Sequence, residues 1–356
     1  MSIFQRTTPV GVRGRHITYR PELDGIRGLA IIMIVFHHFD YVGYNYFGGR
    51  GFLGVDIFFA LSGYLITQIL IASRKKKENI GFFYLRRVAR LYPILVISVV
   101  GISIYYRNNY QFLDRSPAIN SILYIKNFKP WGGVFGPLWS LAAEEQFYLI
   151  FPAILFFGLK FLRKRGLSAL LILYVAAIWT HALIINSPQF NFNQDGVFNL
   201  VIFRPSILLV GCLIAIHKDW LEKLVSRRVY LTLALFVICV WGTIRFQFPP
   251  LAGIATGLLI LLISETVVRK SLITRLMRAL IGARPIAWIG LLSYSIYIWH
   301  LPLIFINTHH FMIKAITNMP LFFLQLLIIA GISFYLIERP AMRVITSLAN
   351  KIFSKK

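Results

Sequence analysis

Ten apolar runs, each close to 20 residues long, constrain the fold of this chain more than any other feature. A helix of that length crosses the hydrocarbon core of a bilayer. The chain of 356 residues is 57% hydrophobic and only 14% charged, with a mean hydropathy of +0.68, which excludes an average soluble protein. We therefore predict an all-α membrane protein, a polytopic bundle of about ten transmembrane helices. The runs lie at roughly 23–43, 53–72, 91–106, 135–159, 167–186, 198–216, 229–246, 250–268, 285–307 and 320–337.

The charges of the chain are unbalanced in number and uneven in position. The sequence has 38 Lys and Arg against 13 Asp and Glu, a formal net charge of +25. In a soluble protein this charge would suggest nucleic-acid binding. Here most of the basic residues fall in alternate connections between the apolar runs. Because positively charged loops stay in the cytoplasm, we predict that both termini are cytoplasmic and that nucleic acid is not a partner.

The same distribution divides the chain into three parts. Residues 1–22 are predicted to form a basic cytoplasmic segment, 23–340 the transmembrane domain and 341–356 a basic cytoplasmic tail. Cys212 and Cys239 lie in separate runs and lack a CxxC spacing, so we expect neither a disulfide framework nor a zinc site. No metal is predicted.

The first apolar run carries ionisable residues that a simple anchor would not need. Each such group near the centre of a membrane helix costs roughly 2.5 to 3.5 kcal/mol. Arg27 and His38 are 11 residues apart, which is about 20° from three full turns and about 16 Å along a helix. They share a face with Asp24, whereas His37 points roughly 80° away. Arg27 and His38 therefore mark an interior pathway, unless Arg27 reaches the headgroups and His38 bonds a neighbouring helix.

Polar residues recur in other runs. Asp56 lies near the outer end of the second run, and Arg204 precedes Pro205 in the sixth. Glu144 and Tyr148 are spaced i,i+4 in the fourth run, so a carboxylate and a phenol share one face. Since buried charges persist when they are paired or functional, these residues predict a polar cavity inside the bundle.

The two adjacent glutamates of the fourth run must point about 100° apart. Glu144 is in register with Ser140 and Tyr148 and belongs to a polar stripe. Glu145 lies on an apolar stripe and must be protonated or paired with an arginine such as Arg204. We expect Glu144 to serve the site and Glu145 to serve packing.

Several motifs, in order, resemble the integral-membrane acyltransferase-3 family. The similarity extends from about Tyr19 to Pro340, and it is carried by "YRPELDGIRGLA" running to "HH", "GFLGVDIFFALSGYLIT", "FYLRRVARLYP", "GPLWSLAAEEQFYL", "LSYSIYIWHLPL" and "IERP". In that family an arginine, ten residues and a histidine on the first helix form the motif taken as catalytic, which falls here on Arg27 and His38. The resemblance implies a multi-pass protein of the bacterial cytoplasmic (inner) membrane.

The resemblance also implies a reaction. The family transfers an acyl group, usually acetyl, from cytoplasmic acyl-coenzyme A to a hydroxyl of a carbohydrate or lipid-linked saccharide. The expected co-substrate is acetyl-CoA, and membrane lipid is an expected partner. We assign catalysis to His38, Arg27 and Glu144. Donor binding is assigned to Arg27, Arg86, Arg87 and Arg90, and substrate binding to Asp56, Trp139, Tyr148 and Arg204.

Elementary chemistry is compatible with these roles. A sugar hydroxyl is a weak nucleophile, and the neutral imidazole of His38 can take its proton. Arg27 can hold the donor or stabilise an oxyanion. The segment containing Arg86, Arg87 and Arg90 is amphipathic; its arginines suit coenzyme A phosphates, and equally suit anionic lipid.

Two other functions remain open at this point. Interior Arg, His and Glu are also typical of a proton-coupled secondary transporter, and a lipid-binding or regulatory protein can retain the shape without the chemistry. His300, which precedes Pro302, is expected to have a packing role. Glu338, Arg339 and Pro340 are expected to mark the cytoplasmic end of the last helix and to serve as an anchor. The acceptor and the oligomeric state are left open.

Overall fold

The computed structural model describes residues 19–39, 50–110, 116–128, 133–185, 206–246, 248–310 and 319–353. Within these ranges every regular element is helical and no strand occurs. The elements in the first half of the chain are α1 (Pro21–Phe39), α2 (Leu53–Lys75), α3 (Ile80–Tyr110), α4 (Ser116–Ile122), 3₁₀ turns at Lys126–Phe128 and Gly136–Leu138, α5 (Trp139–Phe161) and α6 (Arg163–Ile185).

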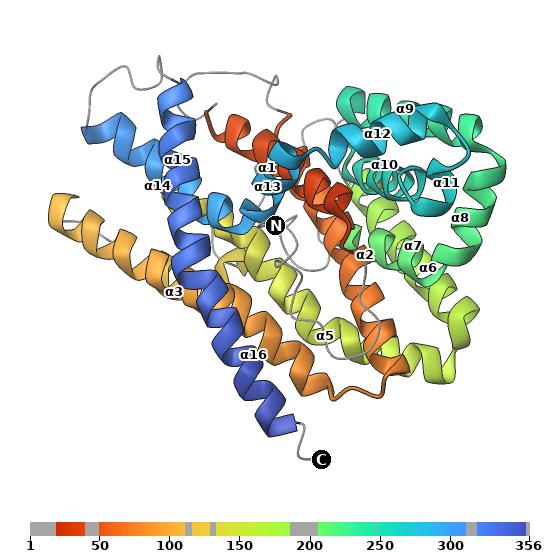
Figure 1. Ribbon diagram of the computed structural model, residues 1–356, viewed down its shortest axis with the longest axis horizontal. Coiled ribbons are helices and arrows are strands. Elements are labelled where there is room, and N and C mark those ends of the chain that lie inside the picture. Colours follow the sequence, from red (N-terminus) through yellow and green to blue (C-terminus); the bar gives the residue numbers. More distant parts are fainter. Residues whose placement is uncertain are drawn as a thin grey trace, which may run out of the picture.

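The helices in the second half of the chain are mostly shorter than those in the first half. They are α7 (Ile207–Ile216), α8 (Lys218–Arg227), α9 (Val229–Phe246), α10 (Pro249–Leu262), α11 (Glu265–Val268), α12 (Leu272–Ile281), α13 (Arg284–Leu291), α14 (Ser293–His310), α15 (Met319–Ser333), a π-helical turn at Phe334–Glu338 and α16 (Arg339–Phe353). In Figure 1, α3, α14, α15 and α16 gather on one side and α6 to α12 on the other. Helices α1, α2 and α5 lie between these two groups.

The number of membrane spans differs from the sequence prediction. Each of the ten predicted runs overlaps a helix, but among the described residues only five helices are long and apolar enough to cross a membrane, or six if a bent pair counts as one span. Helices α7 and α10 have 10 and 14 residues, and α1 carries Glu22, Asp24 and Arg27 within its 19 residues. A bundle of ten full spans is therefore not confirmed, whereas an all-helical, multi-pass membrane protein is.

Two of the predicted runs have unexpected shapes. The amphipathic segment with the three arginines is continuous with the third run, so that α3 is one helix of 31 residues with Pro93 inside it. Conversely, the run predicted at 285–307 is broken between α13 and α14, which meet at 72°. This break lets α13 pack along α1 while α14 enters the core.

The outer surface supports a membrane setting. Helix α9 exposes Tyr230, Val237, Ile238 and Trp241, each at 60% or more. Large apolar side chains that cover one helix are favourable against lipid and unfavourable against water. On α12, Leu272, Leu276 and Leu280 are exposed at i, i+4 and i+8, a pattern typical of a helix that lies in the membrane interface.

Glycine lets α2 and α7 approach closely. A Cβ on Gly63 would overlap the carbonyl oxygen of Leu208, and a Cβ on Gly211 would overlap that of Ala60. Small residues at such crossings bring two backbones into contact, the usual way in which membrane helices associate. This contact fixes α2, which forms one wall of the site described below.

We predict that Gly63→Ala destabilises the protein by about 3 kcal/mol, the upper end of the range for overpacking, because a backbone carbonyl cannot move aside as a side chain can. The matched control is Gly101→Ala on α3, where an added Cβ has no neighbour within 4 Å. There alanine is expected to be neutral or slightly stabilising. Thermal unfolding in detergent measures both variants, and equal melting temperatures for the two would contradict the close contact.

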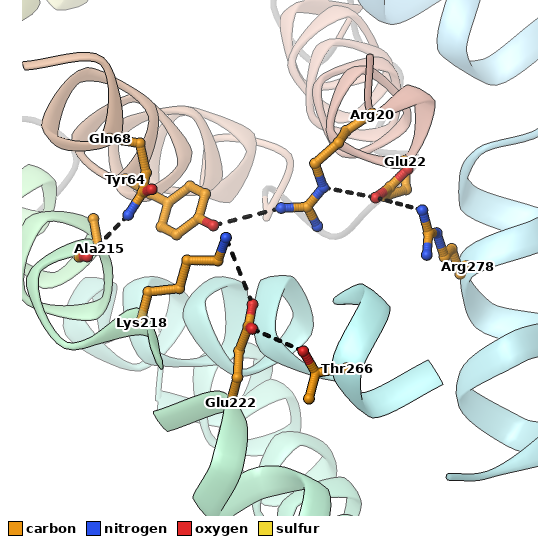
Figure 2. Close-up of polar contacts among 9 residues, drawn as sticks. All are labelled: Arg20, Glu22, Tyr64, Gln68, Ala215, Lys218, Glu222, Thr266 and Arg278. Atoms are coloured by element: carbon orange, nitrogen blue, oxygen red, sulfur yellow. Dashed lines mark hydrogen bonds and ion pairs between the residues drawn. The ribbon is translucent and has the colours of Figure 1, made fainter. Parts of the chain in front are cut away.

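A polar network fixes the beginning of α1 (Figure 2). Glu22 is only 1% exposed, and its Oε1 atom lies 2.8 Å from Nε of Arg20 and 3.4 Å from Nη2 of Arg278 on α12. Arg20 also reaches the hydroxyl of Tyr64 on α2, at 3.5 Å. The buried carboxylate of Glu22 thus connects α1 with α12, and Arg20 extends the network to α2.

The π-helical turn at Phe334–Glu338 joins α15 to α16. In such a turn each backbone N–H bonds to the carbonyl five residues earlier instead of four, so the turn contains one residue more than an α-helical turn. Glu338 is 2% exposed, and Ser295 of α14 donates a hydrogen bond to its carboxylate. Glu338 therefore does not mark a helix end as expected, because the helix continues through the π turn into α16 and Glu338 lies inside the bundle against α14.

Candidate active site

A cavity of about 150 Å³ lies where α1, α2, α3, α5 and α14 converge. Its polar lining includes Arg27, Arg87, Arg90, Glu144, Tyr148 and Tyr297, and α2 contributes a mostly apolar wall. Three arginines therefore face one carboxylate in this cavity. A polar cavity in an apolar bundle is the default place to look for a binding site.

Helix α1 presents one face to this cavity. Arg27 lines it and donates a hydrogen bond to Oδ1 of Asp24 at 3.0 Å, one turn earlier. Ile34 also lines the cavity, and His38 follows one turn beyond Ile34. Arg27, Ile34 and His38 thus follow one stripe, as the helical period requires. His38 itself lies past the cavity lining and is 8% exposed.

The hydrogen bonds of His38 assign its tautomer. Its Nδ1 atom lies 2.8 Å from the carbonyl oxygen of Ile34, which can only accept. Nδ1 therefore carries the hydrogen, and Nε2 carries the lone pair in the neutral ring. A neutral imidazole of this tautomer can act as a base through Nε2. The neighbouring His37 is less buried and packs edge-on against Phe52.

A second histidine lies against the first. Nε2 of His300 on α14 is 3.1 Å from Nδ1 of His38, and the two rings are 4.7 Å apart. His300 is fully buried. The sequence interpretation gave His300 a packing role and did not bring it to His38, because nothing in local spacing relates positions 262 residues apart. The one sequence feature that could have drawn attention to His300 is its position in "YIWHLP", two residues before Pro302 in an apolar run.

Arg87 is held by the two glutamates of α5. It forms a two-pronged ion pair with Glu145, with Nη2 2.7 Å and Nε 2.9 Å from Oε1. The same guanidinium lies 3.9 Å from Glu144 and 3.3 Å above the ring centre of Tyr148. Tyr148 in turn donates a hydrogen bond to Glu144. The partner that Glu145 requires is Arg87; Arg204, named as a candidate partner, lies outside the described residues.

The two glutamates of α5 differ in whether they line the cavity. Ser140, Glu144 and Tyr148 all line the cavity, and Glu145 does not. Their positions follow from the i,i+4 stripe of one helix. The part that Glu144 plays in catalysis stays a prediction.

The three arginines of α3 do not share one environment. Arg90 lines the cavity with Arg87 and forms no ion pair within the part of the chain that the structure describes. Arg86 lies off the cavity lining, 3.4 Å from Glu78 and stacked over Phe82 at 4.1 Å. Arg90 is thus the arginine of α3 best placed to receive an anionic group.

Two predicted substrate-binding residues lie in the core instead of on the cavity. Asp56 is completely buried, and Trp139 is 6% exposed and packs edge-on against Phe59. The predicted substrate-binding residue Arg204 lies outside the described residues. Among the described residues, no group of three or more His, Cys, Asp or Glu side chains is arranged to hold a metal ion.

Sequence comparison shows the family to which the chain belongs. Residues 20–339 match the family model described as an acyltransferase domain. The chain belongs to the acyltransferase-3 family. The match covers α1 through the π-helical turn, and therefore every element around the cavity. No solved structure matches the chain.

The relatives of this acyltransferase-3 member are longer proteins. It is 30% identical to the putative peptidoglycan O-acetyltransferase YrhL of Bacillus subtilis, over 92% of this chain and 55% of that protein. It is also 30% identical to the peptidoglycan O-acetyltransferase OatA of Listeria monocytogenes, over 90% of this chain and 56% of that protein. The O-acetyltransferase OatA of Staphylococcus aureus is 28% identical over similar shares. The chain thus spans about half the length of the curated relatives it matches.

Proposed function

We propose that this chain is a membrane O-acyltransferase that moves an acyl group, most simply acetyl, from acyl-CoA to a hydroxyl of a carbohydrate or lipid-linked saccharide. The observation that carries the proposal is the single stripe of α1 on which Arg27 and Ile34 line the cavity and His38 follows. It is supported by membership of the acyltransferase-3 family.

The proposed reaction is a direct transfer. Nε2 of His38 removes the proton of the acceptor hydroxyl as its oxygen attacks the thioester carbonyl carbon. A carbon–oxygen bond forms, the carbon–sulfur bond breaks, and the coenzyme A thiolate takes the proton back from His38. Arg27 lies about 16 Å from His38 along α1, too far to contact the same carbonyl group, so it is assigned to holding the donor and not to stabilising the oxyanion.

The donor is proposed to enter from the cytoplasm. Most basic residues lie in the connections on one side of the predicted topology, and the positive-inside rule assigns that side to the cytoplasm. Arg27 lies two turns from the start of α1, and Arg90 faces the same cavity from α3. These guanidinium groups can hold phosphate or carbonyl oxygens by charge-assisted hydrogen bonds. Arg87 is already occupied by Glu145 and is assigned to supporting the site.

The acceptor is proposed to be a cell-envelope saccharide. The relatives YrhL and OatA are named for O-acetylation of peptidoglycan, which makes a peptidoglycan-type saccharide the first acceptor to test. The comparisons give no support to the transporter interpretation.

Membrane vesicles of defined orientation test the proposal. Inside-out vesicles containing the protein and supplied with labelled acetyl-CoA are expected to release coenzyme A thiol and to accumulate ester-linked label on saccharide. Sealed right-side-out vesicles are expected to do neither. Equal use of acetyl-CoA from both faces would overturn the cytoplasmic donor, and the absence of ester in both preparations would overturn the acyltransferase itself.

We expect Arg90→Gln to raise the KM for acetyl-CoA about tenfold, because a charge-assisted contact to an anion contributes about 1.5 kcal/mol or more. The matched control is Arg86→Gln, four residues away on α3 and paired with Glu78 outside the cavity lining. Its KM is expected to stay within about twofold of the wild type. Steady-state kinetics in inside-out vesicles measures both, and a larger change for Arg86→Gln would move the donor site away from the cavity.

A further inference from the structure

We propose that His300 is a positioning residue for His38: by accepting the Nδ1 hydrogen of His38, it holds the base against α14, whose preceding turn lines the cavity through Tyr297. This inference rests on the proposed function, in which His38 is the base. It assigns a role to a buried side chain that the reaction described above does not use.

The tautomer of His300 follows from its own partner. Nδ1 of His300 lies 2.7 Å from the carbonyl oxygen of Tyr297, one turn earlier on α14, and a carbonyl can only accept. Nδ1 of His300 therefore carries the hydrogen, which leaves Nε2 with the lone pair. That lone pair is 3.1 Å from Nδ1 of His38. Donor and acceptor match without a change of protonation in either ring.

The Nδ1 hydrogen of His38 thus has two acceptors, and each orients the ring relative to a different helix. The carbonyl of Ile34 belongs to α1, so it orients the ring only relative to its own helix. His300 belongs to α14, so it orients the ring relative to a second wall of the cavity. When Nε2 of His38 gains a proton, the charge spreads to the Nδ1 hydrogen, and an extra lone pair on that hydrogen stabilises the imidazolium.

Tyr297, whose carbonyl accepts from His300, is itself held by hydrogen bonds of its hydroxyl. Tyr297 donates a hydrogen bond from its hydroxyl to the carbonyl of Pro137 at 2.6 Å, and that hydroxyl also lies 2.6 Å from the Ser140 hydroxyl at the start of α5. Tyr297 and Ser140 both line the cavity. The ring of His38 is thereby tied through His300 and Tyr297 to the same helix that carries Glu144.

Two polar replacements separate the acceptor role from simple packing. The oxygen of Gln in His300→Gln can occupy the position of Nε2 and still accept from His38. In His300→Asn the shorter side chain can donate its amide N–H to the Tyr297 carbonyl but cannot reach Nδ1 of His38. We expect kcat to fall less than about fivefold for His300→Gln and about 10- to 100-fold for His300→Asn and His300→Leu, with the KM for acetyl-CoA unchanged in all three.

A double-variant cycle makes the result decisive. If His300 acts through His38, His38→Ala/His300→Leu is expected to be no less active per inserted molecule than His38→Ala alone. A further loss in the double variant, or an Asn variant as active as the Gln variant, would overturn the positioning role. A His38→Ala variant with full activity would instead overturn the proposed base, so the two failures are distinguishable.

Discussion

Replacing His38 with alanine is expected to lower acyl transfer per inserted molecule by about 100- to 10,000-fold, the range that a general base contributes. The physical reason is the tautomer: the Nδ1 hydrogen is directed at the Ile34 carbonyl, which leaves Nε2 as the basic nitrogen of a buried ring. The measurement is ester formation from labelled acetyl-CoA in inside-out vesicles, normalised to the amount of inserted protein.

The adjacent histidine provides the matched control for this experiment. His37 is on the same helix, and its ring is 5.3 Å from that of His38, but it points to a different face. His37→Ala is expected to retain activity within a few-fold of the wild type. Full activity of His38→Ala together with loss in His37→Ala would reverse the assignment of the base.

Removing the positive charge of Arg87 is expected to destabilise the protein by about 3–5 kcal/mol, because it leaves the Glu145 carboxylate without its partner inside the bundle. The two side chains are only 21% and 19% exposed and are joined by a two-pronged ion pair. Arg87→Met is therefore expected to reach the membrane in low amounts. In the double variant Arg87→Met/Glu145→Leu, which removes both charges, most of the lost stability should return.

The two glutamates should respond differently in the same assays. Glu145→Gln is expected to lower mainly abundance and melting temperature, whereas Glu144→Gln is expected to lose most turnover per inserted molecule while the protein remains stable. Thermal unfolding in detergent and turnover in vesicles separate the two effects. A Glu145→Gln protein that is abundant but inactive would show that the ion pair belongs to the catalytic site.

The features that could be predicted from the sequence are those that depend on a single helix. The apolar runs located all the helices that surround the cavity, and the 3.6-residue period placed Arg27 in register with His38 and Glu144 in register with Tyr148. It also indicated that Glu145 needs a partner. Each of these inferences uses only the geometry of one helix.

The features that could not be predicted depend on how helices pack. Arg87 and Glu145 are 58 residues apart, and His38 and His300 are 262 apart; no local spacing records such contacts. A hydropathy window likewise averages across the break between α13 and α14, so it reported one span in place of two helices at 72°. Nor does the motif around Trp139 show that its side chain is 6% exposed and packs against Phe59; its part in substrate binding stays a prediction.

Because of the π-helical turn at Phe334–Glu338, the packing of α16 depends more on the number of residues in this turn than on which residues they are. Deleting one residue there would convert the turn to an α-helical one, which would rotate α16 by about 100° relative to α15 and draw it in by about 1.5 Å. A different face of α16 would then meet α3, the helix that carries Arg87 and Arg90. A side-chain change in α16 alters one contact, whereas a one-residue deletion in this turn puts every contact of the helix out of phase.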